Sequence, residues 1–392
     1  MNEIIKHYPL QHNKESTTMR TLTGLLLIDA QHSALSNAGT ERRGGAKNTT
    51  FVKKVRLRGD SLPYVSPQAF RNWWRMTTLE ETRMRGRPWT PSPISRGEDT
   101  AYTEGNPILY EDDDLFGYML TTTGEGEEPG TVHRRISPLK CSPLVSVLSN
   151  VLTTDEGSMA RQEGGVYVDA ERNQQFAPGF AVRYNQEFYA TVLKGLFSLT
   201  LDTVGVFDVG LGYDLDETRR QAALVRGAQE TTITTGTQAE GGSQVTRARL
   251  TLPEDIRKQR IEDLLLSLPV IRGGAKLSPY LTDVTPKFIV MAVLSCSNHI
   301  FMEVVREAND NAFVDLEALR EILTDFADRI LSPVYIGLRK GFLEKQRSEL
   351  LALANEQIQV SRNGQARTIT FSVGTPNQAV ENVVQFIRGM RL

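Results

Sequence analysis

Two short apolar runs near opposite ends of this chain set the first limits on its fold. They are TLTGLLLID at 21–29 and FIVMAVL at 288–294. Neither run alternates apolar with polar residues, which is typical of strands buried on both faces of a sheet. Both are far shorter than the ~20 residues that a membrane span needs. We therefore predict buried strands at 21–29 and 286–296, and no membrane partner.

Strand-like and helix-like segments alternate irregularly along the 392 residues, with long polar stretches between them. This pattern favours an α+β core with insertions over a doubly wound sheet. Further strands are predicted at 51–57, 134–148, 180–192 and 367–374. Helices are predicted at 66–84, from 112, at 253–268, over most of 303–358 and at the C-terminus. The remaining stretches are predicted to be a long loop (30–50), an irregular insertion (86–107), a polar excursion (149–178) and a low-complexity segment (229–245).

The charges are segregated, although the formal net charge is only −2. Residues 41–90 hold twelve Lys and Arg against four Asp and Glu, whereas 97–130 hold ten acidic residues and no basic one. We interpret this as a cationic side that faces a ligand and a separate acidic side.

The cysteines and the N-terminal sequence predict a reduced, cytoplasmic protein. Cys141 and Cys296 are the only cysteines, so they cannot form a disulfide framework, and neither belongs to a C-x-x-C pair. The N-terminal sequence has no apolar segment of the kind found in signal peptides.

The stretch PYVSPQAFRNWWR at 63–75 predicts a helix with two different faces. Ser66 suits the N-cap, and the proline that follows suits the first helical position. Phe70, Trp73, Trp74 and Thr77 recur at helical spacing and form the predicted buried stripe. The other face begins at the helix N-terminus, which favours anions, and it holds the side chains of Gln68, Arg71 and Arg75.

Basic residues continue from this helix into the two elements before it. A single charge of this kind is usually a solvated side chain. Like charges crowded on consecutive elements, however, repel one another unless a polyanion joins them, and arginine suits bidentate binding of phosphate. We predict a polyanion site formed by Arg42, Arg43, Lys47, Lys54, Arg56, Arg58, Arg71 and Arg75.

Several motifs, in the order in which they occur, resemble one known family. They are LLLIDAQHSALSNAG (25–39), YVSPQAFRNWWR (64–75), DDLFGYM (113–119), RRISPLKCSPLVSV (134–147), QQFAPGFAVRYN (174–185) and IRGGAKLSPYLTDVTPKFIV (271–290). The family is the backbone subunit of the type I CRISPR Cascade surveillance complex, in the DevR-like autoregulator group of subtype I-B systems. The resemblance extends over about 21–345.

The resemblance implies a modified RRM-like (ferredoxin-like) palm with inserted helical finger regions and an extended thumb, built as one elaborated domain over 1–392. It places a finger-type insertion at 86–130, the thumb at 149–178, a second insertion with a mobile loop at 205–262 and a helical region at 300–360. No aromatic-rich strand of the kind that stacks bases in an RRM is visible, which fits a grip on the backbone rather than base readout.

The resemblance also implies a function without cofactors or metals. Such subunits stack head-to-tail along CRISPR RNA, hold its backbone without reading sequence, and act with other Cascade subunits on target DNA that pairs with the guide. Met159 would lie beside a displaced base at the thumb tip, and Lys276 would lie in a loop that approaches RNA. The full set of candidate RNA-binding residues is Asn37, Arg42, Arg43, Lys47, Lys53, Lys54, Arg56, Ser66, Gln68, Arg71, Arg75, Met159, Arg161 and Lys276.

Two other functions remain open at this point. One is an RRM-like endoribonuclease that processes CRISPR RNA with His32 as general base. The 30–50 segment lacks the Asp of cleaving relatives, however, and its only acidic residue is Glu41. The other is a DNA-binding regulator, for which no helix-turn-helix pattern is visible. The five histidines show no metal-ligand spacing, and we interpret the acids at 111–114 as the start of a helix rather than a metal site.

Overall fold

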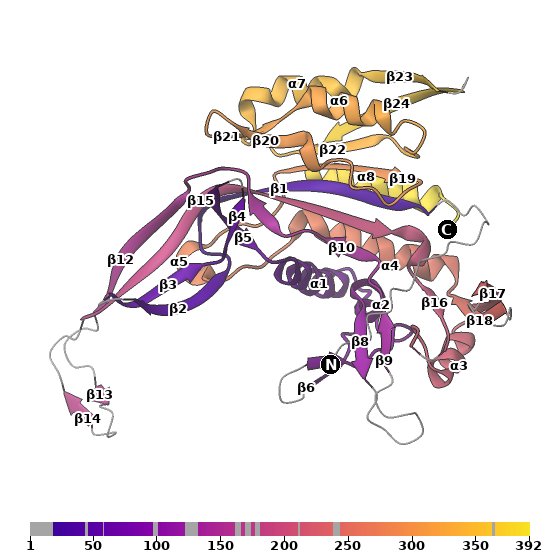
Figure 1. Cartoon of the computed structure of the whole chain (residues 1–392), viewed down its shortest axis with the longest axis horizontal. Helices are drawn as coiled ribbons and strands as arrows, with labels where there is room; N and C mark the ends of the chain where they lie inside the picture. The colour runs from indigo at the N-terminus through magenta and orange to yellow at the C-terminus, as the bar shows by residue number, and fades with distance from the viewer. Residues whose placement is uncertain are drawn as a thin grey trace.

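The computed structural model describes residues 19–43, 46–57, 59–96, 101–121, 132–160, 166–168, 174–176, 181–210, 212–237, 244–362 and 365–392. Helices and strands are mixed, and most strands belong to one large sheet (Figure 1). No helix among the described residues is long and apolar enough to cross a membrane.

The two apolar runs form neighbouring strands at the centre of this sheet, as predicted. β1 (Thr21–Ser33) pairs antiparallel with β19 (Phe288–Leu294) on one side and with β15 (Ala181–Thr200) on the other. Every residue of β19 is buried, so both of its faces contact protein. The strand order is β23-β24-β22-β19-β1-β15-β11-β5-β4, and β2, β3, β10 and β12 pair beside this path. The remaining bounds in the sheet are β2 (Asn37–Arg43), β3 (Ala46–Val52), β4 (Lys54–Leu57), β5 (Asp60–Val65), β10 (Leu139–Cys141), β11 (Leu144–Ser146), β12 (Leu152–Ala160), β22 (Val334–Leu338), β23 (Gln357–Arg362) and β24 (Gln365–Gly374).

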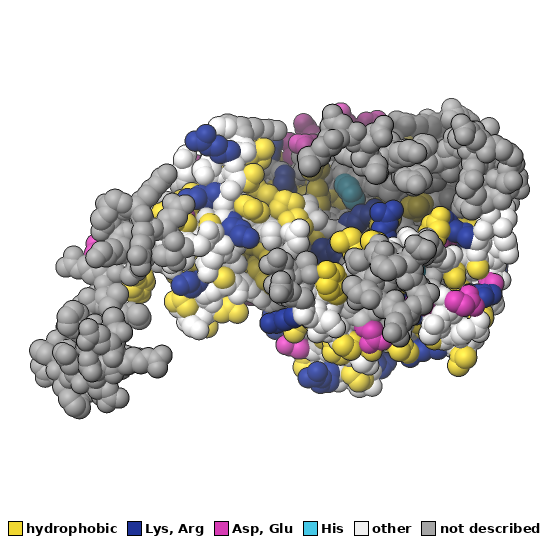
Figure 2. Space-filling view, turned by 60° about the horizontal axis from the view of Figure 1, so that its bottom comes forward, with side chains coloured by type: hydrophobic (Ala, Val, Ile, Leu, Met, Phe, Trp, Pro, Cys, Tyr) yellow, Lys and Arg dark blue, Asp and Glu magenta, His cyan; other side chains and the backbone are white. Residues whose placement is uncertain are grey.

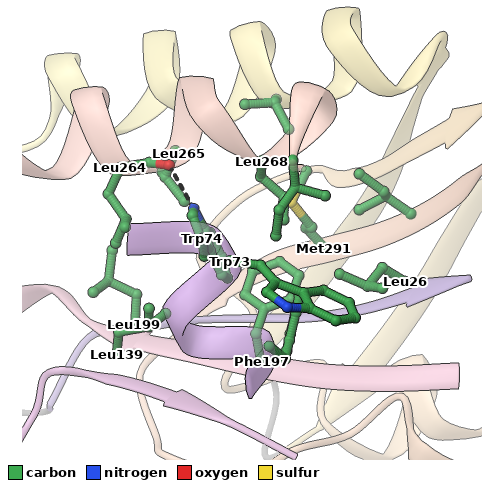
Figure 3. Packing of buried hydrophobic residues seen from close by; sticks show 14 of the residues in the cluster. Leu26, Trp73, Trp74, Leu139, Phe197, Leu199, Leu264, Leu265, Leu268 and Met291 are labelled. Atoms are coloured by element: carbon green, nitrogen blue, oxygen red, sulfur yellow. Dashed lines mark hydrogen bonds between the residues drawn. The ribbon is translucent and has the colours of Figure 1, made fainter. Parts of the chain in front are cut away.

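Three helices cover one face of the central strands. α1 (Pro67–Met84), α4 (Glu254–Ser267) and α8 (Pro376–Gly389) enclose a core with the even-numbered side chains of β1, among them Leu22 and Leu26. Figure 3 shows Trp74 of α1 between α4 and β15. These three helices confirm the predicted helices at 66–84, 253–268 and the C-terminus.

The opposite face is covered by the C-terminal region, so the sheet is buried on both sides around β1. Leu25 and Leu27 point into a second core with residues of α6 (Leu316–Asp325), α7 (Arg347–Ala352) and the hairpin of β20 (Val305–Ala308) and β21 (Asn311–Val314). The prediction of a helical region at 300–360 is therefore wrong in part, because this region also contains β20, β21, β22 and most of β23. The β20–β21 turn is Asn309-Asp310, and both residues have positive φ, as a tight hairpin requires.

A long β arm projects from the sheet (Figure 1). β15 continues beyond the core and pairs antiparallel with the whole of β12, while β3 pairs parallel with β15 at Asn185 and Gln186. The polar stretch 149–178 thus contains a regular strand, followed by the small pair β13 (Val166–Val168) and β14 (Gln174–Phe176). The predicted loop at 30–50 is also wrong: it holds the end of β1 and the β2–β3 hairpin. In β12, Thr153, Thr154, Asp155 and Glu156 are exposed, so this part of the polar stretch shows no apolar pattern.

The segment 86–135, which includes the finger-type insertion predicted at 86–130, consists in its described part of short strand pairs around one small helix, so the prediction of a helical finger is wrong there. Its elements are β6 (Ile94–Arg96), β7 (Ala101–Thr103), α2 (Glu111–Phe116), β8 (Tyr118–Thr121) and β9 (Val132–Arg135). β16 (Val206–Asp208), β17 (Gln229–Thr237) and β18 (Gln244–Thr251) form a separate sheet beside α3 (Glu217–Val225). The low-complexity prediction at 229–245 missed β17 and the start of β18, because a threonine-rich sequence also favours a strand.

The acids of α2 are buried, so the prediction of a separate acidic side does not hold for them. Asp112, Asp113 and Asp114 are at most 3% exposed. The Asp114 carboxylate pairs with Arg135 of β9 and with Arg260 of α4, and it accepts a hydrogen bond from the backbone N–H of Gly205. This one carboxylate ties the insertion to α4 and to the start of the β16–β18 unit.

Candidate nucleic-acid interface

Helix α1 begins where the sequence predicts. The Ser66 side chain accepts a hydrogen bond from the Ala69 N–H, and the following proline occupies the first helical position. The predicted stripe is buried, with Trp74 fully enclosed and Trp73 8% exposed. The Trp74 indole N–H donates to the Leu264 carbonyl at 2.9 Å, which fixes α1 against α4 (Figure 3). The tryptophans are therefore part of the core, as predicted.

The GGAK loop (273–276) packs against Trp73. Gly273 lies so close to the indole that a Cβ atom there would be 2.2 Å from Trp73 Cγ, so only glycine fits. The Ala275 N–H donates to the Leu35 carbonyl, which joins the loop to the end of β1. Lys276 follows in a left-handed conformation with an exposed side chain.

Three more candidate cations lie on or beside the edge strand β4. All four residues of β4 are exposed, including Val55 (37%) and Leu57 (51%), so apolar as well as basic side chains of this strand face solvent. Lys54 Nζ lies 2.8 Å from Glu187 Oε1. Arg56 and Lys53 form no salt bridge with any residue that the structure describes.

Arg71 and Arg75 have intramolecular partners that the helical pattern could not predict. Arg71 donates to the Phe116 carbonyl and to Ser137 Oγ, and burial lowers the pKa of its guanidinium. Arg75 Nη1 lies 3.0 Å from Oδ2 of the buried Asp112. The Gln68 side chain, on the first turn of the same helix, is exposed. Of the three predicted ligand-facing side chains on α1, two therefore hold the 86–135 insertion in place.

The other candidates meet where β1 ends. Ser36 Oγ donates to the Tyr64 carbonyl, two residues before the N-cap Ser66. Asn37 is exposed and pairs across the hairpin with Val52, next to Lys53. Lys276 is brought to the same place by the Leu35 contact. Figure 2 shows Lys and Arg side chains spread across the middle of this side of the molecule, from the arm to the body, with few Asp and Glu among them.

Several candidate residues lie outside the described part of the structure. These are the side chains of Arg42, Arg43, Lys47 and Met159, together with all of Arg58 and Arg161. The backbone of Met159 is in β12, where it pairs with Val182 of β15.

His32 and the acidic residues of α2 are the candidates for hydrolytic or metal chemistry. The exposed His32 ring has no hydrogen-bond partner among them, so no described group orients it as a general base. No group of three or more His, Cys, Asp or Glu side chains in the described ranges could hold a metal ion. The carboxylates of Asp112–Asp114 accept hydrogen bonds from the side chains of Arg75, Ser92 and Arg135, respectively.

Sequence reasoning missed Glu187, which organises the base of the arm. It is 6% exposed, and its carboxylate accepts from Lys54 Nζ and, at 3.0 Å, from the Val52 N–H. The residues next to Glu187 in the sequence do not indicate this role, because both of its partners lie more than a hundred residues away in the sequence.

Comparison with known proteins gives a family. No curated protein matches this sequence significantly. Among solved structures, one chain of a CRISPR RNA-guided surveillance complex is 11% identical over 82% of this chain and 90% of its own, with a TM-score of 0.40. A chain of such a complex in a pre-nicking state is 10% identical over 94% and 100%, with a TM-score of 0.43. The model of the CRISPR-associated negative auto-regulator DevR/Csa2 family matches residues 41–317. Because that match spans more than half of the sequence, the chain belongs to the DevR/Csa2 family of CRISPR-associated proteins.

Proposed function

We propose that this protein is the RNA-binding backbone subunit of a type I-B CRISPR surveillance complex. It oligomerises head-to-tail along CRISPR RNA, holds the phosphate backbone independently of sequence, and presents the guide for pairing with target DNA. The other Cascade subunits complete the assembly. The observation that carries the proposal is the β arm, whose base is surrounded by exposed Lys and Arg side chains, in a chain of a CRISPR-associated family.

The connectivity of the central strands supports an RRM-like palm. When the elements inserted between them are left out, the core elements occur in the order strand (β1), helix (α1), strand (β10 with β11), strand (β15), helix (α4) and strand (β19). The sheet places these strands side by side and antiparallel in the order β19, β1, β15, and then β10 with β11. Both helices belong to the same core. A ferredoxin-like unit, on which RRM domains are built, has the same βαββαβ order, and this supports the proposed palm.

The two covered faces of this sheet favour a grip on phosphates. An RRM stacks bases on aromatic side chains of its open sheet face. Here that face carries Leu25, Val192 and Val290 and is packed against the C-terminal region. Cations on the edge strand β4 and on the GGAK loop remain accessible, and Lys and Arg contacts to phosphate carry no sequence information.

The alternative endoribonuclease is the weaker proposal. It needs an oriented general base, and among the described residues nothing hydrogen-bonds the His32 ring. We therefore propose that the protein binds RNA without cleaving it. His32→Ala should leave labelled guide RNA intact, as the parent protein does. Cleavage by the parent that disappears in this variant would establish the enzyme instead.

Purification from the native host tests the function directly. The protein should carry RNA, and sequencing should return CRISPR repeat and spacer sequence. The double variant Arg56→Gln with Lys276→Gln should retain less RNA at the same protein yield. Lys345→Gln, an exposed lysine of the C-terminal region, is the matched control. RNA of random cellular origin, or none, would contradict the proposal.

A further inference from the structure

Three aromatic rings from distant parts of the sequence lie close together at the base of the arm, and we call them the aromatic row. His32, at the end of β1, lies 6.2 Å from Phe188 of β15, measured between ring centroids. Tyr280, the last residue of α5 (Leu277–Tyr280), lies 6.0 Å from Phe188, again measured between ring centroids. The Phe188 and Tyr280 planes differ by only 31°, so the two rings face in similar directions. The row was not expected, because the sequence holds no aromatic-rich strand of the RRM kind.

The row is held by a turn with a fixed backbone. Both ends of α5, Lys276 and Leu281, adopt left-handed conformations, which are uncommon for residues with side chains. Tyr280 N donates to the Lys276 carbonyl, and Leu281 N donates to the Leu277 carbonyl at 2.7 Å. Thr282 Oγ1 donates to the His32 carbonyl at 3.1 Å, so the turn and the end of β1 keep their relative positions. A residue in a sparsely populated conformation persists only where its surroundings impose it, and such residues cluster at functional sites.

The row is accessible to a ligand. His32 is exposed, and Phe188 and Tyr280 are half-buried. Leu281, directly after Tyr280, is 84% exposed, and Lys276 is exposed at the other end of the turn. Planar rings beside an accessible cation are the two elements with which proteins hold single-stranded nucleic acid, the ring for the base and the cation for the backbone.

We propose that Tyr280, Phe188 and His32 form a stacking site for a nucleobase of single-stranded RNA, with Lys276 contacting a neighbouring phosphate. The site rests on the RNA-binding function proposed above and adds contact with bases to it. Stacking of this kind tolerates any base, because every base has a π face. It is therefore compatible with a subunit that does not read sequence.

The surroundings favour a base over a phosphate next to Tyr280. Desolvation raises the pKa of its hydroxyl, and the Asp155 carboxylate on the neighbouring strand β12 raises it further. A carboxylate that close repels a phosphate group but not a neutral base. Tyr184 extends the aromatic surface along β15: it is 36% exposed, and its ring covers Gly157, where a Cβ atom would be 2.4 Å away.

Abasic RNA separates base contacts from backbone contacts. Tyr280→Ala should weaken binding of an oligouridine at fixed salt by about 5-fold to 150-fold, the range for loss of one stacked base. It should leave binding of an abasic RNA of the same length unchanged, because that RNA offers no base to stack. Tyr280→Phe keeps the ring and should bind both RNAs like the parent. Lys276→Gln should weaken both equally.

The outcomes distinguish this site from the general function. A parent protein that binds neither RNA contradicts the proposed function and this site with it. A parent that binds both, with Tyr280→Ala weakening both equally or neither, overturns the stacking site alone. A Tyr280→Ala variant that binds oligouridine normally but changes the sedimentation of the RNA-free protein would assign the row to a protein contact instead.

Discussion

Replacing Asp114 by Asn should remove a large part of the free energy of unfolding, although the two side chains have nearly the same size. The Asp114 carboxylate is 0% exposed and lies between Arg135 and Arg260, which are 5% and 2% exposed. Arg260 Nη1 is 2.6 Å from Oδ2, and Gly205 N donates to the same oxygen at 2.9 Å. Asn keeps one acceptor but places an N–H group where a guanidinium now donates.

The expected loss follows from the burial of the two arginines. Removing one partner of a buried ion pair costs about 3–5 kcal/mol, because the remaining charge stays buried and uncompensated. The free energy of unfolding of a typical domain is only ~5–15 kcal/mol, so this single change removes a large part of it. The effect should spread, since Asp114 joins α2, β9, α4 and the residues before β16.

Urea unfolding monitored by tryptophan fluorescence measures this loss. Asp114→Asn should lower the free energy of unfolding within the stated range, and Asp60→Asn is the control. Asp60 is exposed and forms no ion pair with any described residue, so its replacement should change that free energy by less than about 0.5 kcal/mol. A loss below ~1 kcal/mol in Asp114→Asn would refute the reasoning that this carboxylate compensates two buried charges.

Three further predictions concern the buried Trp74, the Arg75–Asp112 ion pair and the β arm. Trp74→Ala should lower the free energy of unfolding by ~3–5 kcal/mol in the same urea assay, because the ring is fully buried and its N–H is bonded to α4. Arg75→Ala should destabilise the protein at neutral pH, unlike Gln68→Ala. Burial, and then the neighbouring Asp113 charge, raise the pKa of Asp112 in the folded state, so the folded protein binds this proton more tightly than the unfolded chain. The loss of stability in Arg75→Ala should therefore shrink as the pH falls towards the ordinary Asp range near ~4, where Asp112 is protonated and no longer needs the guanidinium. Replacing 155–172 with a short Gly/Ser linker should reduce the size of RNA-dependent oligomers in sedimentation, and oligomers that match the parent would contradict the proposed role of the arm.

The parts of the fold that were predictable are those whose pattern is set by local burial. β1 and β19 contact protein on both faces, so each is a continuous apolar run, and α1 shows its N-cap and its buried stripe within eighteen residues. The arm strand β15 was predicted in part, at 180–192, whereas β2, most of β3 and β12 were missed because their sequences show no alternation of apolar and polar residues. The β20–β21 hairpin was missed because its short strands lie in a region whose apolar residues also fit a helix.

The candidate site was predictable only in outline. The excess of basic residues in 41–90 predicts a polyanion site there, but the sequence does not show which charges find partners inside the molecule. Arg71 and Arg75 are bound by α2 and its flanking loop, and Lys54 by Glu187, through contacts that only the tertiary structure creates. The rings of His32, Phe188 and Tyr280 come together from three separate elements, so no sequence motif predicts their contact.

The salt dependence of RNA binding tests the central claim most directly. The claim is that cations at the base of the arm hold the RNA backbone, so the logarithm of the association constant should fall linearly with the logarithm of salt concentration, with a slope near −0.7 per phosphate contact on a single strand. Filter binding of one RNA should show this for the parent and for Lys345→Gln. The slope should become shallower by about 0.7 for each contact removed in Arg56→Gln with Lys276→Gln. A parent protein whose affinity does not change with salt, or a double variant with the same slope and affinity as the parent, would contradict the account.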